Sequence, residues 1–182
     1  MKNHILLPCA IAIIVAIVSI VGLFLPYIGS TPEYTEYLKT TSNQKPFESA
    51  DITAADSVDL SLYEYAKTYY QGGEEIFRNK AEGIFYAVLF ASPGILGFFA
   101  LLCALRKKGF PLFLQSLFIG GLFYLINWDV VDRGIMPQHG RVWGIAHSLY
   151  YPISVILLIC GIWIFIVKHK MKKVEKKKRR VE

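Results

Sequence analysis

The residues best suited to chemistry lie together in one polar stretch of the C-terminal half of the chain. They comprise two carboxylates, two guanidinium groups, two imidazoles and one amide, namely Asn127, Asp129, Asp132, Arg133, His139, Arg141 and His147. Carboxylates and imidazoles can hold divalent metals or transfer protons. Their spacing matches no metal motif, so we expect neither a metal nor a cofactor. Pairing of aspartates with arginines, which would lock this loop, is the favoured interpretation, and contact with a substrate or ion is the alternative.

Motifs of the common enzyme mechanisms are absent from the sequence. It contains no GxSxG nucleophile turn, no HExxH zinc motif, no phosphate-binding glycine loop and no dinucleotide-binding glycine run. The cysteines Cys9, Cys103 and Cys160 form no CxxC pair, which argues against thiol–disulfide chemistry. We therefore expect a protein that is not an enzyme.

Four long apolar blocks must position the polar residues. The chain has 182 residues, of which 54% are hydrophobic, and a helix needs about 20 mostly apolar residues to cross about 30 Å of hydrocarbon. The blocks begin near residues 5, 83, 110 and 143. We predict an all-α integral membrane protein, a four-transmembrane-helix bundle. Residues 1–29 form its uncleaved anchor, and residues 83–167 form the other three spans, connected by a turn at 106–109 and a loop at 129–142.

The distribution of basic residues predicts the orientation of these helices. Thirteen Lys and Arg residues lie on the side of the two termini and the 106–109 turn, and seven lie on the other side. Because Lys and Arg are enriched on the cytoplasmic face, we predict that both termini are cytoplasmic. Residues 30–82 then lie outside, and they contain neither cysteine nor an N-x-S/T sequon, which favours a bacterial plasma membrane.

Residues 30–82 are expected to form a small, mainly helical extracytoplasmic domain. Thr31 followed by Pro32 is a typical helix start. Ser61 and Glu64 have the spacing of a capping box, which predicts a second helix. The segment 50–60 is compatible with either a strand or a loop.

The helix that follows Ser61 has a clear apolar face and a glycine-rich end. Its apolar positions follow helical spacing and are Leu62, Tyr65, Ala66 and Tyr69. We predict that Gly72 and Gly73 end this helix and that the next helix begins near Glu74. Glu74, Arg78 and Glu82 would then be i, i+4 partners on that next helix.

Tyrosine is concentrated in the same loop, which holds six of the eleven tyrosines in the chain. Tyrosine offers rigid contact area with a polar tip and is enriched at recognition surfaces. Two interpretations stay open, because the rings could fill the core of the loop domain or bind a partner. The candidate interaction surface consists of Tyr34, Tyr37, Tyr63 and Tyr70.

Pro93 and Gly94 lie near the middle of the second apolar block. A proline inside a helix removes one hydrogen bond and kinks the helix, and a neighbouring glycine lets another helix approach closely. We predict a kink that is fixed by packing, with a moving hinge as the alternative.

The tail, residues 168–182, holds nine of the basic residues directly after the last span. Each basic residue near an anionic bilayer surface contributes about 1 kcal/mol of attraction. We therefore expect anionic membrane lipid as the partner of the tail, and no nucleic acid.

Four spans, two inner termini, a long first outer loop and a short second one resemble the layout of the claudins. Claudins carry a tryptophan-rich motif and two cysteines in the first outer loop, and residues 30–82 contain neither residue type. No functional residue can therefore be carried over from that family. We expect an accessory protein that docks another membrane or extracytoplasmic protein. The alternatives are a small transporter or channel subunit, which would require a homo-oligomer, and a membrane-embedded enzyme acting on a lipid or isoprenoid.

Overall fold

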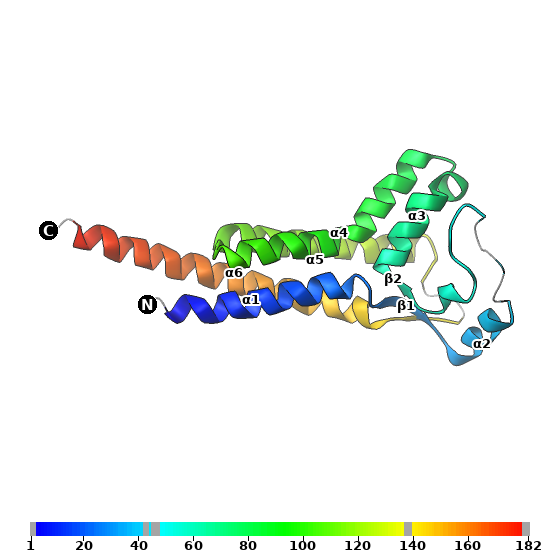
Figure 1. The fold of residues 1–182 in the computed structure, drawn as a ribbon, viewed down its shortest axis with the longest axis horizontal. Coiled ribbons are helices and arrows are strands. Elements are labelled where there is room, and N and C mark those ends of the chain that lie inside the picture. The colour runs from blue at the N-terminus through cyan, green and yellow to red at the C-terminus, as the bar shows by residue number, and fades with distance from the viewer. Residues whose placement is uncertain (1–2, 42–43, 45–47, 137–139, 180–182) are drawn as a thin grey trace.

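The computed structural model describes residues 3–41, 44, 48–136 and 140–179. Four long helices dominate it, namely α1 (Asn3–Gly22), α4 (Lys80–Leu105), α5 (Gly109–Asp132) and α6 (Ile145–Lys178). All four are long and apolar enough to cross a membrane, so the four predicted spans are confirmed. In Figure 1, the start of α1 and the end of α6 lie together at one end of the bundle, which we call the terminal end. Helices α2 and α3 lie at the opposite end, which we call the loop-domain end.

The bundle is closed by contacts between neighbouring helices. Helix α1 packs against α4 and α6, and α5 packs against the same two helices. The interior combines small and large apolar side chains, including Ala12, Ala16, Phe90, Ala100, Phe123 and Leu157. Large apolar side chains also cover the outer surface, including Phe85, Phe98, Phe118 and Val155. Such an apolar exterior suits a helix bundle surrounded by lipid.

Helix α4 contains Pro93 and Gly94, and both positions lie close to the C-terminal end of α1. The Ser19 hydroxyl of α1 donates a hydrogen bond to the Pro93 carbonyl oxygen at 3.1 Å. A Cβ atom at Gly94 would lie only 2.9 Å from the Leu23 side chain. Figure 1 shows that α4 changes direction along its length, as proline-containing helices do. These contacts support a kink that is fixed by packing.

The loop domain contains a small sheet that the sequence did not indicate. The shorter elements, which lie at this end of the molecule, are β1 (Pro26–Ser30), α2 (Pro32–Thr40), a 3-10 turn η1 (Asp56–Val58), β2 (Leu60–Ser61), α3 (Leu62–Phe77) and β3 (Arg141–Trp143). Strand β1 lies between β2 and β3 and pairs antiparallel with both. The sheet therefore joins the end of α1, the loop domain and the start of α6. The segment 50–60, left open by the sequence, holds η1 and the start of β2.

The predicted helix starts in the loop domain are confirmed. Thr31 caps α2 by accepting a hydrogen bond from the backbone N–H of Tyr34. Ser61 and Glu64 form the capping box of α3, in which the Ser61 backbone N–H donates to the Glu64 carboxylate at 2.7 Å. The apolar face of α3 is buried as expected, with Leu62 fully buried.

The predicted end of this helix is wrong, because α3 continues through Gly72 and Gly73 to Phe77. It ends at Arg78, which has a φ of 57°, and α4 begins at Lys80. Arg78 therefore lies between two helices, and the predicted i, i+4 pairs on one helix do not exist. The glycines serve close packing, since a Cβ atom at Gly73 would lie 2.5 Å from the Gly83 Cα atom.

Candidate functional site

The structure describes six of the seven predicted polar residues and places them in several environments. Asn127 lies inside the bundle, whereas Asp129 and Arg133 face the hairpin formed by α3 and α4. Arg141 lies on β3, which pairs with β1 beside the loop domain. Asp132 is exposed at the end of α5, and His139 lies outside the described residues. The predicted cluster is therefore divided, because Arg133 and Arg141 line one cavity and its other described members lie outside that cavity.

Asn127 is the centre of a hydrogen-bonded group at the loop-domain end of the bundle. The Tyr27 hydroxyl donates to the Asn127 side-chain oxygen at 2.6 Å, and the Asn127 amide donates to the Tyr151 hydroxyl at 2.7 Å. Tyr27 is fully buried, and this burial raises the pKa of its phenol far above the ordinary value. The group fastens β1 to α5 and α6.

His147 is held by aromatic rings. Its imidazole stacks on Trp143 with 4.1 Å between ring centroids, and Tyr27 and Phe123 lie farther away. Within the described part of the chain, no group of three His, Cys, Asp or Glu side chains gathers that could hold a metal ion. The geometry around His147 thus offers packing and no ligand set.

Arg133 carries an ion pair and lies against three aromatic rings. Its guanidinium pairs with the Asp129 carboxylate one helical turn earlier. The guanidinium carbon lies 4.2 Å from the centroid of the Tyr86 ring and 5.4 Å from those of Tyr69 and Phe77, which are cation–π distances. Burial alone would lower the pKa of Arg133, but Tyr69 and Asp129 hold that pKa above the ordinary value. The expected pairing of an aspartate with an arginine is therefore present between Asp129 and Arg133.

Arg141 has hydrogen-bond partners but no counter-ion among the described residues. Its guanidinium donates to the Ser30 hydroxyl at 3.0 Å and to the Ser57 carbonyl oxygen. The guanidinium carbon lies 5.0 Å from the centroid of the Tyr34 ring. Both ion pairs found in this part of the chain involve other residues. Among the described residues, the half-buried guanidinium of Arg141 therefore forms no ion pair.

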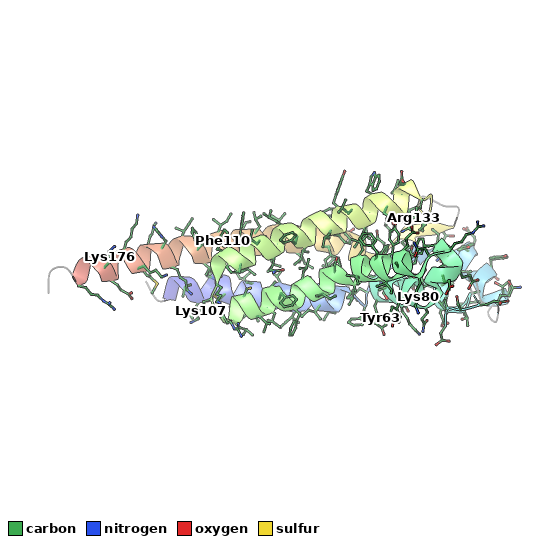
Figure 2. All side chains as sticks on the ribbon, turned by 90° about the horizontal axis from the view of Figure 1, so that it is seen from above. Tyr63, Lys80, Lys107, Phe110, Arg133 and Lys176 are labelled. Carbon is green, nitrogen blue, oxygen red and sulfur yellow. The ribbon has the colours of Figure 1, made fainter. Side chains whose placement is uncertain are left out.

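Both arginines line a cavity of about 530 Å³ in the loop domain. Its wall comes from α2, the segment around η1, α3 and the chain after α5, and includes Tyr34, Tyr37, Ile52, Tyr65, Tyr69 and Ile76. Figure 2 shows Arg133 at the loop-domain end, away from Lys107 and Phe110. A mostly apolar wall with a few charged groups is typical of binding sites. This loop-domain cavity is the candidate functional site.

The tyrosines of the loop divide between the two interpretations. Tyr65 and Tyr69 are buried, and burial raises the pKa of both phenols. Tyr34 is half-buried and stacks on Tyr37 with 5.9 Å between ring centroids. Tyr37, Tyr63 and Tyr70 have exposed fractions of 58%, 48% and 66%. Some rings therefore fill the domain, whereas others leave contact area free.

Sequence reasoning missed the roles of Ser30, Ser57, Tyr65 and Tyr69 in this site. Helical spacing indicated that Tyr65 and Tyr69 are buried, but spacing does not show that a cavity is left beside them. Ser30 and Ser57 lie 27 residues apart in the chain and meet at Arg141 because β1 pairs with both β2 and β3.

Tyr69 offers a direct test of the wall of the cavity. Burial disfavours its phenolate and Arg133 partly offsets this, so that the pKa of Tyr69 is raised to about 12. In an ultraviolet absorbance titration of the folded protein, Tyr69→Phe should remove one phenol from the step near pH 12. Circular dichroism at each pH would verify that the helices persist. If Tyr69→Phe instead removed a phenol that ionises near the ordinary pKa of about 10, the buried placement of Tyr69 would be contradicted.

The fold defines a multi-pass membrane protein with a cavity-bearing loop domain between its first two membrane helices. No family model matches the chain, and no curated protein and no solved structure is similar to it. The function must therefore be argued from the site itself.

Proposed function

We propose that this chain is a non-enzymatic plasma-membrane protein, with both termini cytoplasmic and a bacterial origin, that docks a partner polypeptide through its loop domain. The loop-domain cavity would receive an acidic, apolar-flanked segment of that partner outside the cell. The observation that carries this proposal is the charge of Arg141, which lines the cavity without a counter-ion in the described part of the chain.

Arg141 is well prepared to bind a carboxylate. The Ser30 hydroxyl, the Ser57 carbonyl and the Tyr34 ring fix the position of its guanidinium, so little side-chain entropy is lost on binding. Arg133 differs, because Asp129 already neutralises it. A carboxylate of the partner would therefore bind at Arg141.

The exposed tyrosines favour a polypeptide as the ligand. Tyr37 lines the cavity and is also 58% exposed, so the wall continues onto the surface of α2. Tyrosine and arginine together are enriched in the energetically dominant parts of protein interfaces. A partner segment can fill the cavity and cover the rim at the same time.

The alternative functions find less support in the geometry. A transporter that uses Asp129 for ion contact would need a free carboxylate, but this carboxylate accepts a hydrogen bond from Arg133 and forms an ion pair with it. An enzyme that uses His147 would need a group to orient its imidazole for proton transfer, and aromatic rings surround it instead.

In-cell photo-crosslinking from the rim tests the docking proposal. A benzoylphenylalanine at position 37 should give a discrete adduct, and mass spectrometry should place an Asp, a Glu or a chain terminus beside the linked residue of the partner. Arg141→Gln should lower the adduct yield about tenfold or more, because a charge-assisted hydrogen bond is lost.

The matched control is Lys39→Gln, which removes an exposed charge from α2 outside the cavity and should leave the yield unchanged. An adduct that persists in Arg141→Gln, or a complete lack of adducts from position 37, would refute the docking proposal.

A further inference from the structure

The terminal end of the bundle has a second cavity, far from the loop domain. Helix α6 has 34 residues and spans about 51 Å, which is more than the roughly 30 Å of hydrocarbon in a bilayer. Figure 1 shows its last turns extending beyond the described start of α1 and beyond the connection between α4 and α5. The extension leaves a cavity of about 750 Å³ between α1, this connection and α6.

The lining of this terminal cavity changes from apolar to basic along α6. Ile5, Leu6 and Phe165 form its apolar part, and Leu6 and Phe165 are 52% and 51% exposed. Lys168 and Lys172 follow Phe165 at i+3 and i+7, so all three side chains share one face of the helix. The apolar part lies toward the middle of the bundle and the lysines lie toward the end of the chain.

A third lysine approaches from the connection between α4 and α5. Lys107 lines the same cavity. Neither ion pair in the described residues involves Lys107, Lys168 or Lys172. The acidic residue that lines the cavity is Glu175, which lies about one helical turn after Lys172. The lysine positive charge therefore exceeds the negative charge at this cavity.

We infer that the terminal cavity binds one anionic phospholipid. Its phosphate would lie between Lys107, Lys168 and Lys172, and an acyl chain would cover Ile5, Leu6 and Phe165. Basic residues just beyond a membrane span attract anionic headgroups. In a phospholipid the acyl chains follow the phosphate, just as the apolar side chains of the cavity follow its lysines toward the middle of the bundle. A soluble phosphate would leave the apolar half of the cavity uncovered. This inference is independent of the docking proposal for the loop domain.

Native mass spectrometry of the full chain in detergent can test this site. Titration with dioleoyl phosphatidylglycerol should show one molecule bound at least about tenfold more tightly than dioleoyl phosphatidylcholine. The triple variant Lys107→Gln, Lys168→Gln, Lys172→Gln should lose most of this preference. Inorganic phosphate at millimolar concentration should not displace the phosphatidylglycerol.

The control is a second triple variant, Lys170→Gln, Lys173→Gln, Lys176→Gln, which removes the same charge from positions of α6 outside the cavity lining. It should keep the preference for phosphatidylglycerol. Equal losses in both triple variants would reveal diffuse attraction and overturn the site, as would no preference in the parent chain. Displacement by phosphate would overturn the lipid assignment. Crosslinking from position 37 should persist in both variants, so the two proposals fail separately.

Discussion

Gly83→Ala should strongly destabilise the protein, because the added methyl group has no room between α3 and α4. A Cβ atom at this position would lie 2.5 Å from the Gly73 Cα atom and 2.7 Å from the Tyr69 carbonyl oxygen. Both are backbone atoms of α3, so the two helices must move apart. Overpacking typically costs about 1–3 kcal/mol, and we expect the upper part of this range. Thermal unfolding in detergent, followed by circular dichroism, measures the loss.

Gly121→Ala is the matched control, because it adds the same methyl group within helix α5 where no atom lies within 4 Å of the new Cβ. Alanine is the better helix former, so this variant should be as stable as the parent chain or slightly more stable. Equal stability of Gly83→Ala and Gly121→Ala would mean that α3 and α4 do not pack through their glycines. Separation of the helices should also shift Tyr69 and Ile76 in the wall of the loop-domain cavity.

Asn127→Leu should be the most damaging change among the predicted polar residues. It removes the acceptor of the Tyr27 hydroxyl and the donor to Tyr151, while the size of the side chain is nearly kept. Tyr27 is fully buried, and an unpaired buried hydroxyl costs about 1–3 kcal/mol. Because Tyr27 belongs to β1, the strand that pairs with β2 and β3, the loop domain should loosen together with the end of the bundle.

A double-mutant cycle with Tyr27→Phe separates this hydrogen bond from general packing. Each single variant leaves a buried polar group without its partner, whereas the double variant leaves neither, so the two losses should be less than additive by about 1 kcal/mol or more. Tyr124→Phe, which changes an exposed ring on the same helix, should have no effect. Strict additivity of the two single losses would contradict the coupling of Tyr27 to Asn127.

The local features of this protein could be derived from its sequence because they depend on residues close together in the chain. Four uncharged runs of membrane-spanning length predicted α1, α4, α5 and α6. Thr31 and the pair Ser61 and Glu64 predicted the starts of α2 and α3, since a cap satisfies backbone N–H groups within one helical turn. The ion pair of Asp129 and Arg133 was accessible to the same reasoning because it spans four residues of one helix.

Long-range contacts decided the rest. Two consecutive glycines such as Gly72 and Gly73 are typical of a helix end, because glycine has a low helix propensity. Here the close packing of α3 against α4 outweighs this low propensity, and the helix continues. The sequence groups Arg141 with Asp129, but β3 pairs with β1 and this pairing holds Arg141 against Ser30 instead. The spans, the helix caps and the net charge at each end follow from the order of the amino acids alone. Which of these charges lie together depends on the fold, because strand pairing and helix packing join residues that are far apart in the chain.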